Sequence, residues 1–382
     1  MEKDNNRRKF IKDVGIGAAA LGTAGIAGVL SSCKGKKQEQ AIPKGKAIDW
    51  KMVTTWPPKL PYLQDAAEML AKKVKLMSGG LFKIKVFAGG ELVPPLQTFD
   101  AVSKGTTVQA GSGVSYYQAG KAPAAQWFAA VPFGLNGAGM AAWYEFGGGL
   151  KLWEEMYAPF DVIPRPGGCT GPQMAGWFNK KIESVDDFKG LKMRIPGLGG
   201  KVMAKLGATV VLCPASEIFT NLERGVIDAT EWIGPLHDKL MGFYKVAKYY
   251  YYPGWHEPGP FVEFIFNKKA YESLPLEYQA ILDAACTQVN NWTTQGFNTG
   301  NGQALDELIT QHKVTLMKLP DPVLADLKSH AKDAVSDIAA KDPMAGKVNE
   351  SFERFKKIVG TWGEVSEKPY YNSLTDKYPL KG

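Results

Sequence analysis

The sequence predicts an α/β fold with two lobes, in which mixed sheets are flanked by helices, followed by a helical C-terminal region. Three observations lead to this prediction. Strand and helix patterns alternate after Asp49, two pairs of short segments repeat along the chain, and helical spacing dominates beyond Tyr271. The roughly 335 residues after Asp49 also exceed the usual size of a single core, so two lobes are expected.

The first elements alternate between strand and helix. Trp50–Thr54 and Phe82–Phe87 have the composition of strands, and the second alternates apolar residues with lysines. Between them, Tyr62–Met77 carries apolar residues at helical spacing. Pro94–Lys104 is predicted as a second helix and Val108–Val114 as a third strand. This β-α-β-α-β order predicts a parallel sheet.

Two pairs of similar segments follow. Pro95–Gly105 and Pro214–Gly225 each have the pattern of a short helix, a glycine stop and a strand. The string Phe-Asn-Lys-Lys occurs at 178–181 and again at 266–269, each time followed shortly by Glu-Ser. These pairs predict two similar lobes with paired strands crossing between them. Chance similarity of such short strings is the alternative.

The last part of the chain is predicted to be mainly helical. Helical spacing extends over Leu276–Thr293, Gly302–His312, Pro322–Ala340 and Val348–Val359. These helices are expected to wrap the lobes or to form a dimer contact. After Lys368, proline and aromatic residues predict irregular chain.

The N-terminus has the features of an export signal. Arg7 and Arg8 precede the small apolar run 14–30, which fits a twin-arginine signal for export of folded proteins. Leu30-Ser-Ser-Cys33 resembles the bacterial lipobox, whose cysteine is acylated and becomes the new N-terminus. Two alternatives stay open. One is a single transmembrane anchor, for which the run is short and rich in glycine and alanine; the other is an ordinary cysteine near a standard cleavage site.

These patterns divide the chain into five parts. They are a twin-arginine and lipoprotein signal peptide at 1–32, a lipidated flexible tether at 33–48, the core of the first lobe at 49–165, the core of the second lobe with a return segment at 166–255, and a crossing strand with C-terminal helices at 256–382.

Charge and cysteine content exclude some classes of protein. The net charge of +8 falls to +6 without residues 1–32, which carry five basic and three acidic side chains. The basic residues are scattered and no nucleic-acid-binding motif occurs, so no nucleic-acid partner is predicted. Cys169, Cys213 and Cys286 are widely spaced, which favours buried free thiols over a bridge between the first two.

The motifs of common enzymes are absent from the sequence. There is no H-E-x-x-H, no G-x-S-x-G and no Walker lysine loop. Gly197–Lys201 lacks the upstream glycine and the following Ser or Thr of a phosphate loop, so we predict a turn that opens a helix. None of the four histidines lies three or four residues from another, so a histidine-clustered metal site would need tertiary assembly; they are His237, His256, His312 and His330.

Four residues carry chemistry of a different kind. They are Gln173 in GPQMAGWFN, Arg194 in LKMRIPG, and Glu231 and Trp232 in DATEWIG. A guanidinium presents parallel N–H groups that match the two oxygens of a carboxylate. Gln173 and Glu231 add the oxygen ligands that hard cations prefer, and a cation beside a 2-oxo or 2-hydroxy acid can be chelated by that acid. The alternative for each residue is a solvated surface position.

Aromatic residues mark the ends of predicted strands. Trp56 follows the first strand, and Tyr116 and Tyr117 follow the third. In open α/β sheets, ligands bind beyond the carboxyl ends of the strands. We therefore expect these three side chains to wall a small apolar pocket, whereas most other aromatic residues belong to the core.

Taken together, the segments resemble the substrate-binding proteins of tripartite ATP-independent periplasmic transporters, in the branch that binds 2-oxo or 2-hydroxy monocarboxylates. The resemblance covers nearly the whole mature chain. It is carried by TTWPPKLP, VSYYQAGKAP, GPQMAGWFNKKI, VDDFKGLKMRIPG, GATVVLCPASEIFTNLERGVIDATEWIGP and YPGWHEPGPFVEF. It implies a two-lobed periplasmic binding protein fold of type II-like architecture, hinge closure around a ligand, and delivery to the small and large membrane subunits of a permease, without chemistry on the ligand.

The resemblance also implies residue roles. Arg194 would clamp the ligand carboxylate, while the side chains of Gln173 and Glu231 and the backbone carbonyl of Trp232 would hold Na⁺ or Ca²⁺. Glu257 resembles a further binding-site acid that would accept a ligand hydroxyl or support the cation.

His256 stands where the family pattern has an aromatic residue, a departure that bears on ligand specificity. The implied ligand is pyruvate, another 2-oxo acid or lactate, and the implied location is the periplasm or the outer face of the cytoplasmic membrane, with a homodimer as the expected assembly. Two other hypotheses stay open: a ligand-sensing lipoprotein that reports to a membrane receptor, and a periplasmic oxidoreductase exported with its cofactor.

Overall fold

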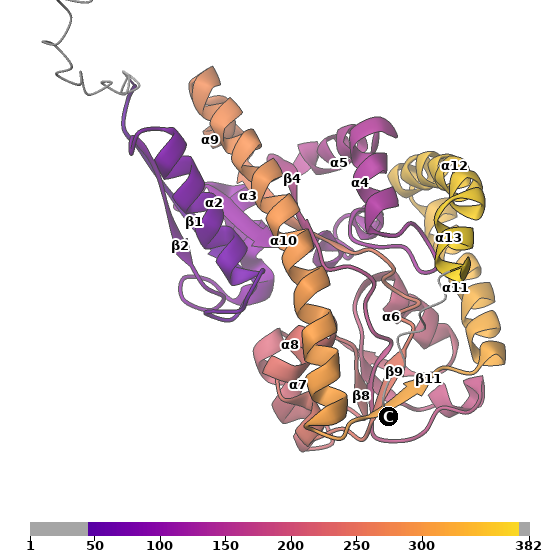
Figure 1. Cartoon of the computed structure of the whole chain (residues 1–382). Helices are drawn as coiled ribbons and strands as arrows, with labels where there is room; N and C mark the ends of the chain where they lie inside the picture. The colour runs from indigo at the N-terminus through magenta and orange to yellow at the C-terminus, as the bar shows by residue number, and fades with distance from the viewer. Residues whose placement is uncertain (1–44, 374–382) are drawn as a thin grey trace, which may run out of the picture. The chain divides into compact units, whose positions relative to one another are not determined.

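The computed structural model describes residues 45–373, and two mixed sheets organise them (Figure 1). Sheet A has the strand order β2-β1-β3-β10-β4, and sheet B has the order β11-β9-β5-β8-β6-β7. The strands of sheet A are β1 Ile48–Thr54, β2 Phe82–Phe87, β3 Ala110–Gly113, β4 Val162–Cys169 and β10 Phe261–Asn267. Those of sheet B are β5 Gly176–Phe178, β6 Lys192–Arg194, β7 Thr209–Val211, β8 Ala229–Thr230, β9 Tyr249–Tyr252 and β11 Thr315–Lys318. The predicted α/β class is confirmed. The proposed signal peptide and the Cys33 lipidation site lie outside the described residues.

The predicted β-α-β-α-β opening is also confirmed. β1 pairs in parallel with both β2 and β3. The connections are α2 (Gln64–Met77) and α3 (Thr98–Lys104), and a 3-10 turn at Pro95–Gln97 precedes α3. Leu70 and Val74 of α2 are fully buried. The apolar face that the spacing predicts therefore holds this helix against sheet A.

The two sheets share one plan, which accounts for the repeated segments. The order β7-β6-β8-β5-β9 in sheet B matches β2-β1-β3-β10-β4 in sheet A, with parallel pairs first and antiparallel pairs after them. α3 and α7 (Ala215–Glu223) occupy equivalent places, and each is followed by a glycine in the left-handed region, with φ of 62° at Gly105 and 68° at Gly225. The two Phe-Asn-Lys-Lys strings lie at the ends of the equivalent strands β5 and β10.

The chain crosses between the sheets twice in this region. Residues 170–175 lead from β4 to β5, and residues 253–260 lead from β9 to β10. The backbone N–H of Gln173 donates to the carbonyl oxygen of Glu257 over 3.1 Å, so the two crossings are bonded to each other. The predicted boundary between residues 165 and 166 lies within β4, and that between 255 and 256 lies within the second crossing.

Shorter helices cover both sheets. α4 (Gly137–Phe146) and α5 (Gly149–Tyr157) pack together beside β4, while α6 (Gly197–Lys205) packs beside β7. The prediction that Gly197–Lys201 opens a helix is confirmed, since α6 begins at Gly197 with φ of 60°. The remaining short elements are α8 Pro235–Leu240, α9 Lys268–Glu272 and the 3-10 turns Ser115–Gln118, Pro123–Phe128, Ala158–Phe160, Val185–Phe188 and Phe243–Lys245.

A single helix, α10, replaces the two that the sequence predicts over 276–293 and 302–312. It runs from Leu276 to Thr310 and contacts β4 and α2 as well as α8 (Figure 1). Two glycines in the interval between the predicted helices allow close packing. A side chain at position 296 would overlap the ring of Tyr62, and one at position 300 would come within 2.8 Å of Leu236. Close packing against neighbouring elements therefore keeps this glycine-rich stretch helical.

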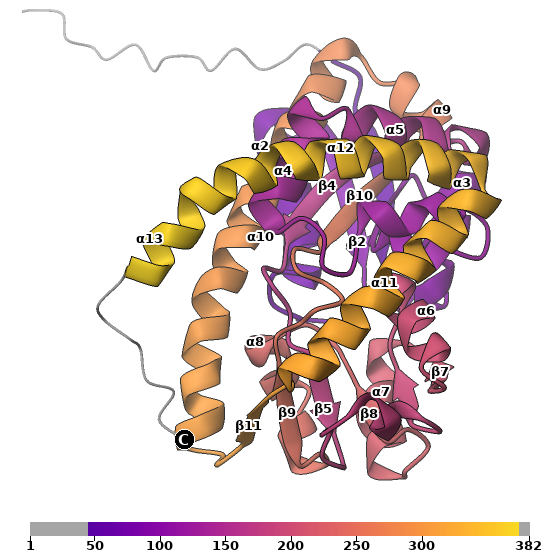
Figure 2. The ribbon, with the colours of Figure 1, turned by 90° about the vertical axis from the view of Figure 1, so that its right-hand side faces the viewer.

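The C-terminal helices depart from the prediction in two other places. β11 pairs with β9 although its short sequence gives no strand pattern. α11 (Asp321–Lys341) and α12 (Pro343–Val365) follow the predicted spacing, and α12 is longer than expected (Figure 2). α13 (Glu367–Ser373) forms where irregular chain was predicted. Pro369 is compatible with this helix because it falls in the first turn, where a backbone N–H has no hydrogen-bond partner within the helix. Residues 374–382 of the predicted irregular tail lie outside the described residues.

One hydrophobic cluster joins the two sheets. It contains Trp56 and Tyr116, which follow strands of sheet A, together with Trp177 and Tyr250 of sheet B and Trp232, which follows its strand β8. The three cysteines of the described chain, at positions 169, 213 and 286, are buried and free, as the spacing favours. Between residues 45 and 373, no helix combines the length and the apolar composition that crossing a bilayer requires.

A buried carboxyl in sheet A predicts a dependence of stability on pH. Glu263 of β10 accepts a hydrogen bond from the Tyr157 hydroxyl at 3.1 Å, and burial raises the pKa of Glu263 to about 8 despite that bond. The folded state then holds this proton more tightly than the unfolded state, whose carboxyl keeps a pKa near 4.5. Stability should therefore fall as the pH rises from that value to about 8.

Glu263→Gln is expected to remove this effect. At pH 8 the variant should be more stable than the parent by about 4 kcal/mol, since a shift of this size corresponds to about 1.4 kcal/mol per pKa unit and the folded-state carboxyl is half ionised at that pH, and near pH 4.5 the two should converge. Urea unfolding at both pH values measures the difference. Glu145→Gln, at an exposed position of α4, is the matched control. The same pH dependence in both variants would contradict the assignment to Glu263.

Candidate functional site

The predicted site residues lie at the carboxyl ends of parallel strands. Arg194 is the last residue of β6, and Glu231 and Trp232 directly follow β8 in the same sheet. On sheet A, Trp56 follows β1 and Tyr116 lies in the 3-10 turn after β3. Because parallel strands end at one edge of a sheet, each group of residues is gathered by its own sheet.

The two crossings supply the remaining residues. Gln173 lies in the first crossing, and His256 and Glu257 lie in the second. A side chain at Gly254 would overlap the backbone of Gln173. This glycine therefore permits the close approach that places Gln173 beside Glu257.

Arg194 and Glu231 form a buried ion pair. Nη1 of Arg194 pairs with Oε1 of Glu231 and donates to the backbone carbonyl oxygen of Glu231 at 3.1 Å. The guanidinium carbon lies 5.3 Å from the centroid of the Trp232 ring. Burial acts to lower the pKa of Arg194, but the charge of Glu231 and the nearby tyrosines raise it above its ordinary value. The guanidinium is therefore a permanent cation.

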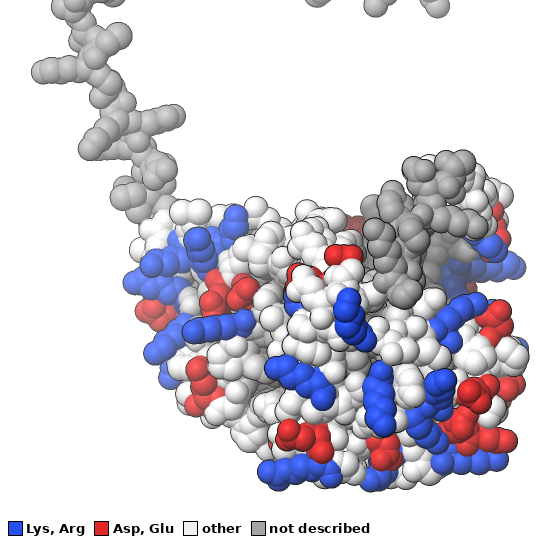
Figure 3. All heavy atoms as spheres, turned by 60° about the horizontal axis from the view of Figure 1, so that its bottom comes forward, with Lys and Arg blue, Asp and Glu red and all other residues white. Residues whose placement is uncertain are grey.

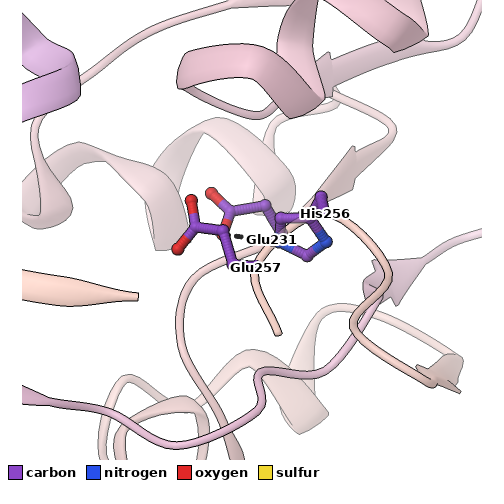
Figure 4. Close-up of side chains that lie close together, drawn as sticks. All are labelled: Glu231, His256 and Glu257. Atoms are coloured by element: carbon purple, nitrogen blue, oxygen red, sulfur yellow. Dashed lines mark hydrogen bonds and ion pairs between the residues drawn. The ribbon is translucent and has the colours of Figure 1, made fainter. Parts of the chain in front are cut away.

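Three side chains form a compact cluster of metal-binding types. Glu231, His256 and Glu257 each offer a ligand atom, and these atoms lie within 4.8 Å of one another. Figure 4 shows the two carboxylates side by side with the His256 ring next to Glu231, whose Oε2 lies 3.3 Å from Nε2 of the ring. Burial, and next the charge of Glu231, raise the pKa of Glu257 well above its usual range, although Arg194 acts in the opposite direction.

Several polar atoms around this cluster are buried without a hydrogen-bond partner among residues 45–373. They include Nε and Nη2 of Arg194, Oε1 of Gln173 and Oε2 of Glu257. Unpaired buried polar atoms are costly and rare, so a group that satisfies several of them at once is expected. The Nε–H and the adjacent Nη2–H of an arginine point in parallel, as a carboxylate requires. The oxygens of Gln173 and Glu257 are suited to a hard cation.

Aromatic side chains enclose these polar groups. Trp56 and Tyr116 belong to the hydrophobic cluster that also contains Trp232, and Tyr117 packs against it. Tyr116 and Tyr117 meet edge to face with their centroids 5.0 Å apart. Burial raises the pKa of both tyrosines, so both hydroxyls are neutral at physiological pH. Arg194, Glu231, His256, Glu257 and Gln173 are all buried, so the polar centre is shielded from water.

The structure thus brings together the residues that the sequence singled out, and it adds one to the polar cluster. His256 was marked only as a departure from a pattern, yet it contacts Glu231 directly. Ser115, next to Tyr116 in the chain, carries a buried hydroxyl that has no hydrogen-bond partner in the described part of the chain. Trp56 is tied to sheet A by a hydrogen bond from its indole to the Ser112 hydroxyl at 3.1 Å, so it contributes as part of the apolar wall.

Known proteins resemble this chain over most of its length. The sequence model of bacterial extracellular solute-binding protein family 7 matches residues 52–342. A monocarboxylate 2-oxoacid-binding periplasmic protein of Nostoc sp. is 42% identical over 357 residues, which cover 94% of this chain and 97% of that protein.

Solved structures show the same relationship. A periplasmic solute-binding protein of a TRAP transporter from Pseudoalteromonas atlantica, with bound sodium and pyruvate, has a TM-score of 0.84 and 38% identity, covering 86% of this chain and 100% of that one. Its counterpart from Colwellia psychrerythraea, with bound calcium and pyruvate, has a TM-score of 0.84 and 39% identity at the same coverage. With a family match over most of its length and relatives of this similarity, the chain belongs to bacterial extracellular solute-binding protein family 7, the substrate-binding proteins of TRAP transporters.

Proposed function

We propose that the protein binds a small 2-oxo or 2-hydroxy monocarboxylate, such as pyruvate, another 2-oxo acid or lactate, together with Na⁺ or Ca²⁺. The observation that carries this proposal is the free pair of N–H groups on Arg194, buried beside two carboxylates. The pyruvate-bound relatives, which hold sodium or calcium, support both parts of it.

Each residue then has a defined task. Nε and Nη2 of Arg194 receive the ligand carboxylate, while Nη1 stays on Glu231. Gln173, Glu231 and the backbone carbonyl of Trp232 are the proposed cation ligands. The cation, when bound, would offset the negative charge of Glu231 and of the ligand carboxylate, and oxygens of the ligand would coordinate it. Glu257 supports the cation or accepts a ligand hydroxyl, and Trp56, Tyr116 and Tyr117 exclude water, which strengthens every charge interaction inside.

Ligand access requires the two sheets to move apart. The polar centre is buried, and its residues come from both sheets and from both crossings. A rotation about the crossings would open the centre without unfolding either sheet. The closed form would then dock on the small and large membrane subunits of the transporter and deliver the ligand.

Export, anchoring and assembly complete the proposal. The twin-arginine signal would export the folded chain, and acylated Cys33 would hold it at the membrane. An exposed apolar stripe on α12 supports a homodimer: Ile358, Trp362 and Val365 lie at helical spacing and are 62%, 68% and 71% exposed. Such a stripe on a surface helix is typical of a protein contact.

Isothermal titration calorimetry with pyruvate, in buffers with Na⁺, with Ca²⁺ or with neither, tests the proposed function. Binding in the presence of one of the cations and its loss without them is expected. Binding that ignores both cations would contradict the cation-bridged site, and failure to bind any short 2-oxo or 2-hydroxy acid would refute the ligand class.

The same titrations on Glu257→Gln test the role of Glu257. A divalent ion gains about twice as much as a monovalent ion from each neighbouring carboxylate. Removing one carboxylate should therefore weaken Ca²⁺-dependent binding on the order of a hundredfold and Na⁺-dependent binding far less. Equal losses with the two cations would contradict this role.

A further inference from the structure

Five lysines surround one cavity at the edge of sheet A, where α2 lies beside β1 and the edge strand β2. The cavity has a volume of about 590 Å³. β1 contributes Lys51, β2 contributes Lys83 and Lys85, and α2 contributes Lys72 and Lys75. All five side chains are exposed, and Asp49 is the single carboxylate that lines the cavity. In Figure 3, several basic side chains lie on the left, with acidic side chains among them, in the part of the molecule where α2, β1 and β2 lie in Figure 1.

These lysines have no acidic partners within the described chain. None of them takes part in an ion pair between residues 45 and 373, although many lysines elsewhere in that range do, such as Lys205 with Asp337 and Lys347 with Glu155. Asp49 is the one carboxylate that lines the cavity beside these five lysines, so most of their positive charge is available to an external anion.

The strand register increases the repulsion among them. In the parallel pairing of β1 with β2, Lys51 is the partner of Lys85. Like charges directly opposite each other on neighbouring strands destabilise a sheet. Lysines also protect edge strands from pairing with other chains, which accounts for Lys83 and Lys85 on the edge strand β2. Lys51 on the inner strand β1, and the two lysines of α2, need another explanation.

We propose that this lysine face, formed by Lys51, Lys72, Lys75, Lys83 and Lys85, binds the anionic phospholipid headgroups of the membrane surface. Charge complementarity is the first argument, because clusters of lysines next to a membrane bind acidic lipids. The length of the preceding chain is the second. Eleven residues separate Cys33 from Gly45, and at roughly 3.5 Å per residue they span at most about 40 Å before β1 begins.

This second argument rests on the proposed acylation of Cys33, whereas the charge argument does not. A chain anchored at Cys33 would hold the lysine face within reach of the bilayer. The carboxyl ends of β1 and β3, where the ligand-binding residues lie, would stay free for the transporter.

Vesicle co-sedimentation tests the proposal. The full chain is prepared with Cys33→Ser so that no acyl group is attached. It is mixed with vesicles of phosphatidylcholine alone, or with vesicles that also contain about 40% phosphatidylglycerol, an anionic lipid that gives the surface a strong negative potential. We expect preference for the anionic vesicles that weakens with added salt. The triple variant Lys51→Gln, Lys83→Gln, Lys85→Gln should lower partition to anionic vesicles by about a hundredfold, at the usual strength of a lysine near such a surface.

A control with the same change in net charge isolates the face. Lys201→Gln, Lys328→Gln, Lys332→Gln removes three exposed lysines of α6 and α11 and should change partition by less than about threefold. Equal losses in the two triple variants, or no preference for anionic vesicles in the parent, would overturn the proposal. Pyruvate titration of the lysine-face variant should match the parent, which separates failure of this surface from failure of the ligand-binding site.

Discussion

Replacing Arg194 by lysine is expected to weaken binding of pyruvate by about 10²- to 10³-fold, and replacing it by alanine should abolish binding. The lysine keeps one positive charge beside Glu231 but loses the parallel N–H groups that Nε and Nη2 now present without partners. Alanine removes the charge as well and leaves Glu231 buried without its counter-ion. That loss is expected to cost about 3–5 kcal/mol of stability in addition to the affinity. Calorimetry measures the affinity and urea unfolding the stability.

Arg165→Lys is the matched control for this experiment. Arg165 is also a paired arginine, with bonds to Glu154 and Asp283, but it lies on β4 outside the candidate site. Its replacement should lower stability and leave pyruvate affinity within about threefold of the parent. If the Arg194 lysine variant keeps full affinity while it remains folded, Arg194 does not receive the ligand carboxylate.

Replacing Gly254 by alanine is expected to destabilise the protein by about 3 kcal/mol and to weaken ligand binding at least tenfold. The added methyl group would overlap the carbonyl group of Gln173, which is backbone and has no rotamer to change. The second crossing must therefore move away from the first. That movement would break the bond from the Gln173 N–H to the Glu257 carbonyl and displace both side chains from the site.

Gly302→Ala provides the comparison for that variant. Gly302 lies within α10 and has open space where its side chain would extend. Alanine there should be neutral or stabilising by about 0.5–1 kcal/mol, because glycine is the weaker helix former. Urea unfolding measures the stability of both variants, and calorimetric titration measures their affinity for pyruvate. If the Gly254 and Gly302 variants had equal stability and equal pyruvate affinity, the contact between the two crossings would not position the site.

Local patterns in the sequence were sufficient for much of the fold. The alternation in Phe82–Phe87 and the apolar spacing of α2 predict a strand and a helix, because an element buried on one face has apolar residues at the period of its own geometry. The repeated Pro95–Gly105 and Pro214–Gly225 segments predict equivalent elements, because a left-handed glycine ends each helix. The family also agrees with the absence of enzyme motifs, since its members bind solutes for transporters and are not enzymes.

Other features were not predictable from local pattern. α10 continues through Gly296 and Gly300 because Tyr62 and Leu236, remote in sequence, occupy the space beside them. β11 is a strand because β9 offers a free edge in parallel register. Each outcome depends on a neighbour that the local sequence does not specify, and tertiary packing overrides propensity at such places.

By itself, the sequence determined which chemical groups are present: an arginine, an amide and two carboxylates in segments that resemble those of carboxylate-binding proteins. Only the tertiary structure decided their relation. It placed Nη1 of Arg194 on Glu231 and left Nε and Nη2 free, brought His256 to Glu231, and buried the whole group between residues of the two sheets. The physical reason is that charge pairing and desolvation depend on distances between segments far apart in the chain, which composition and spacing do not encode.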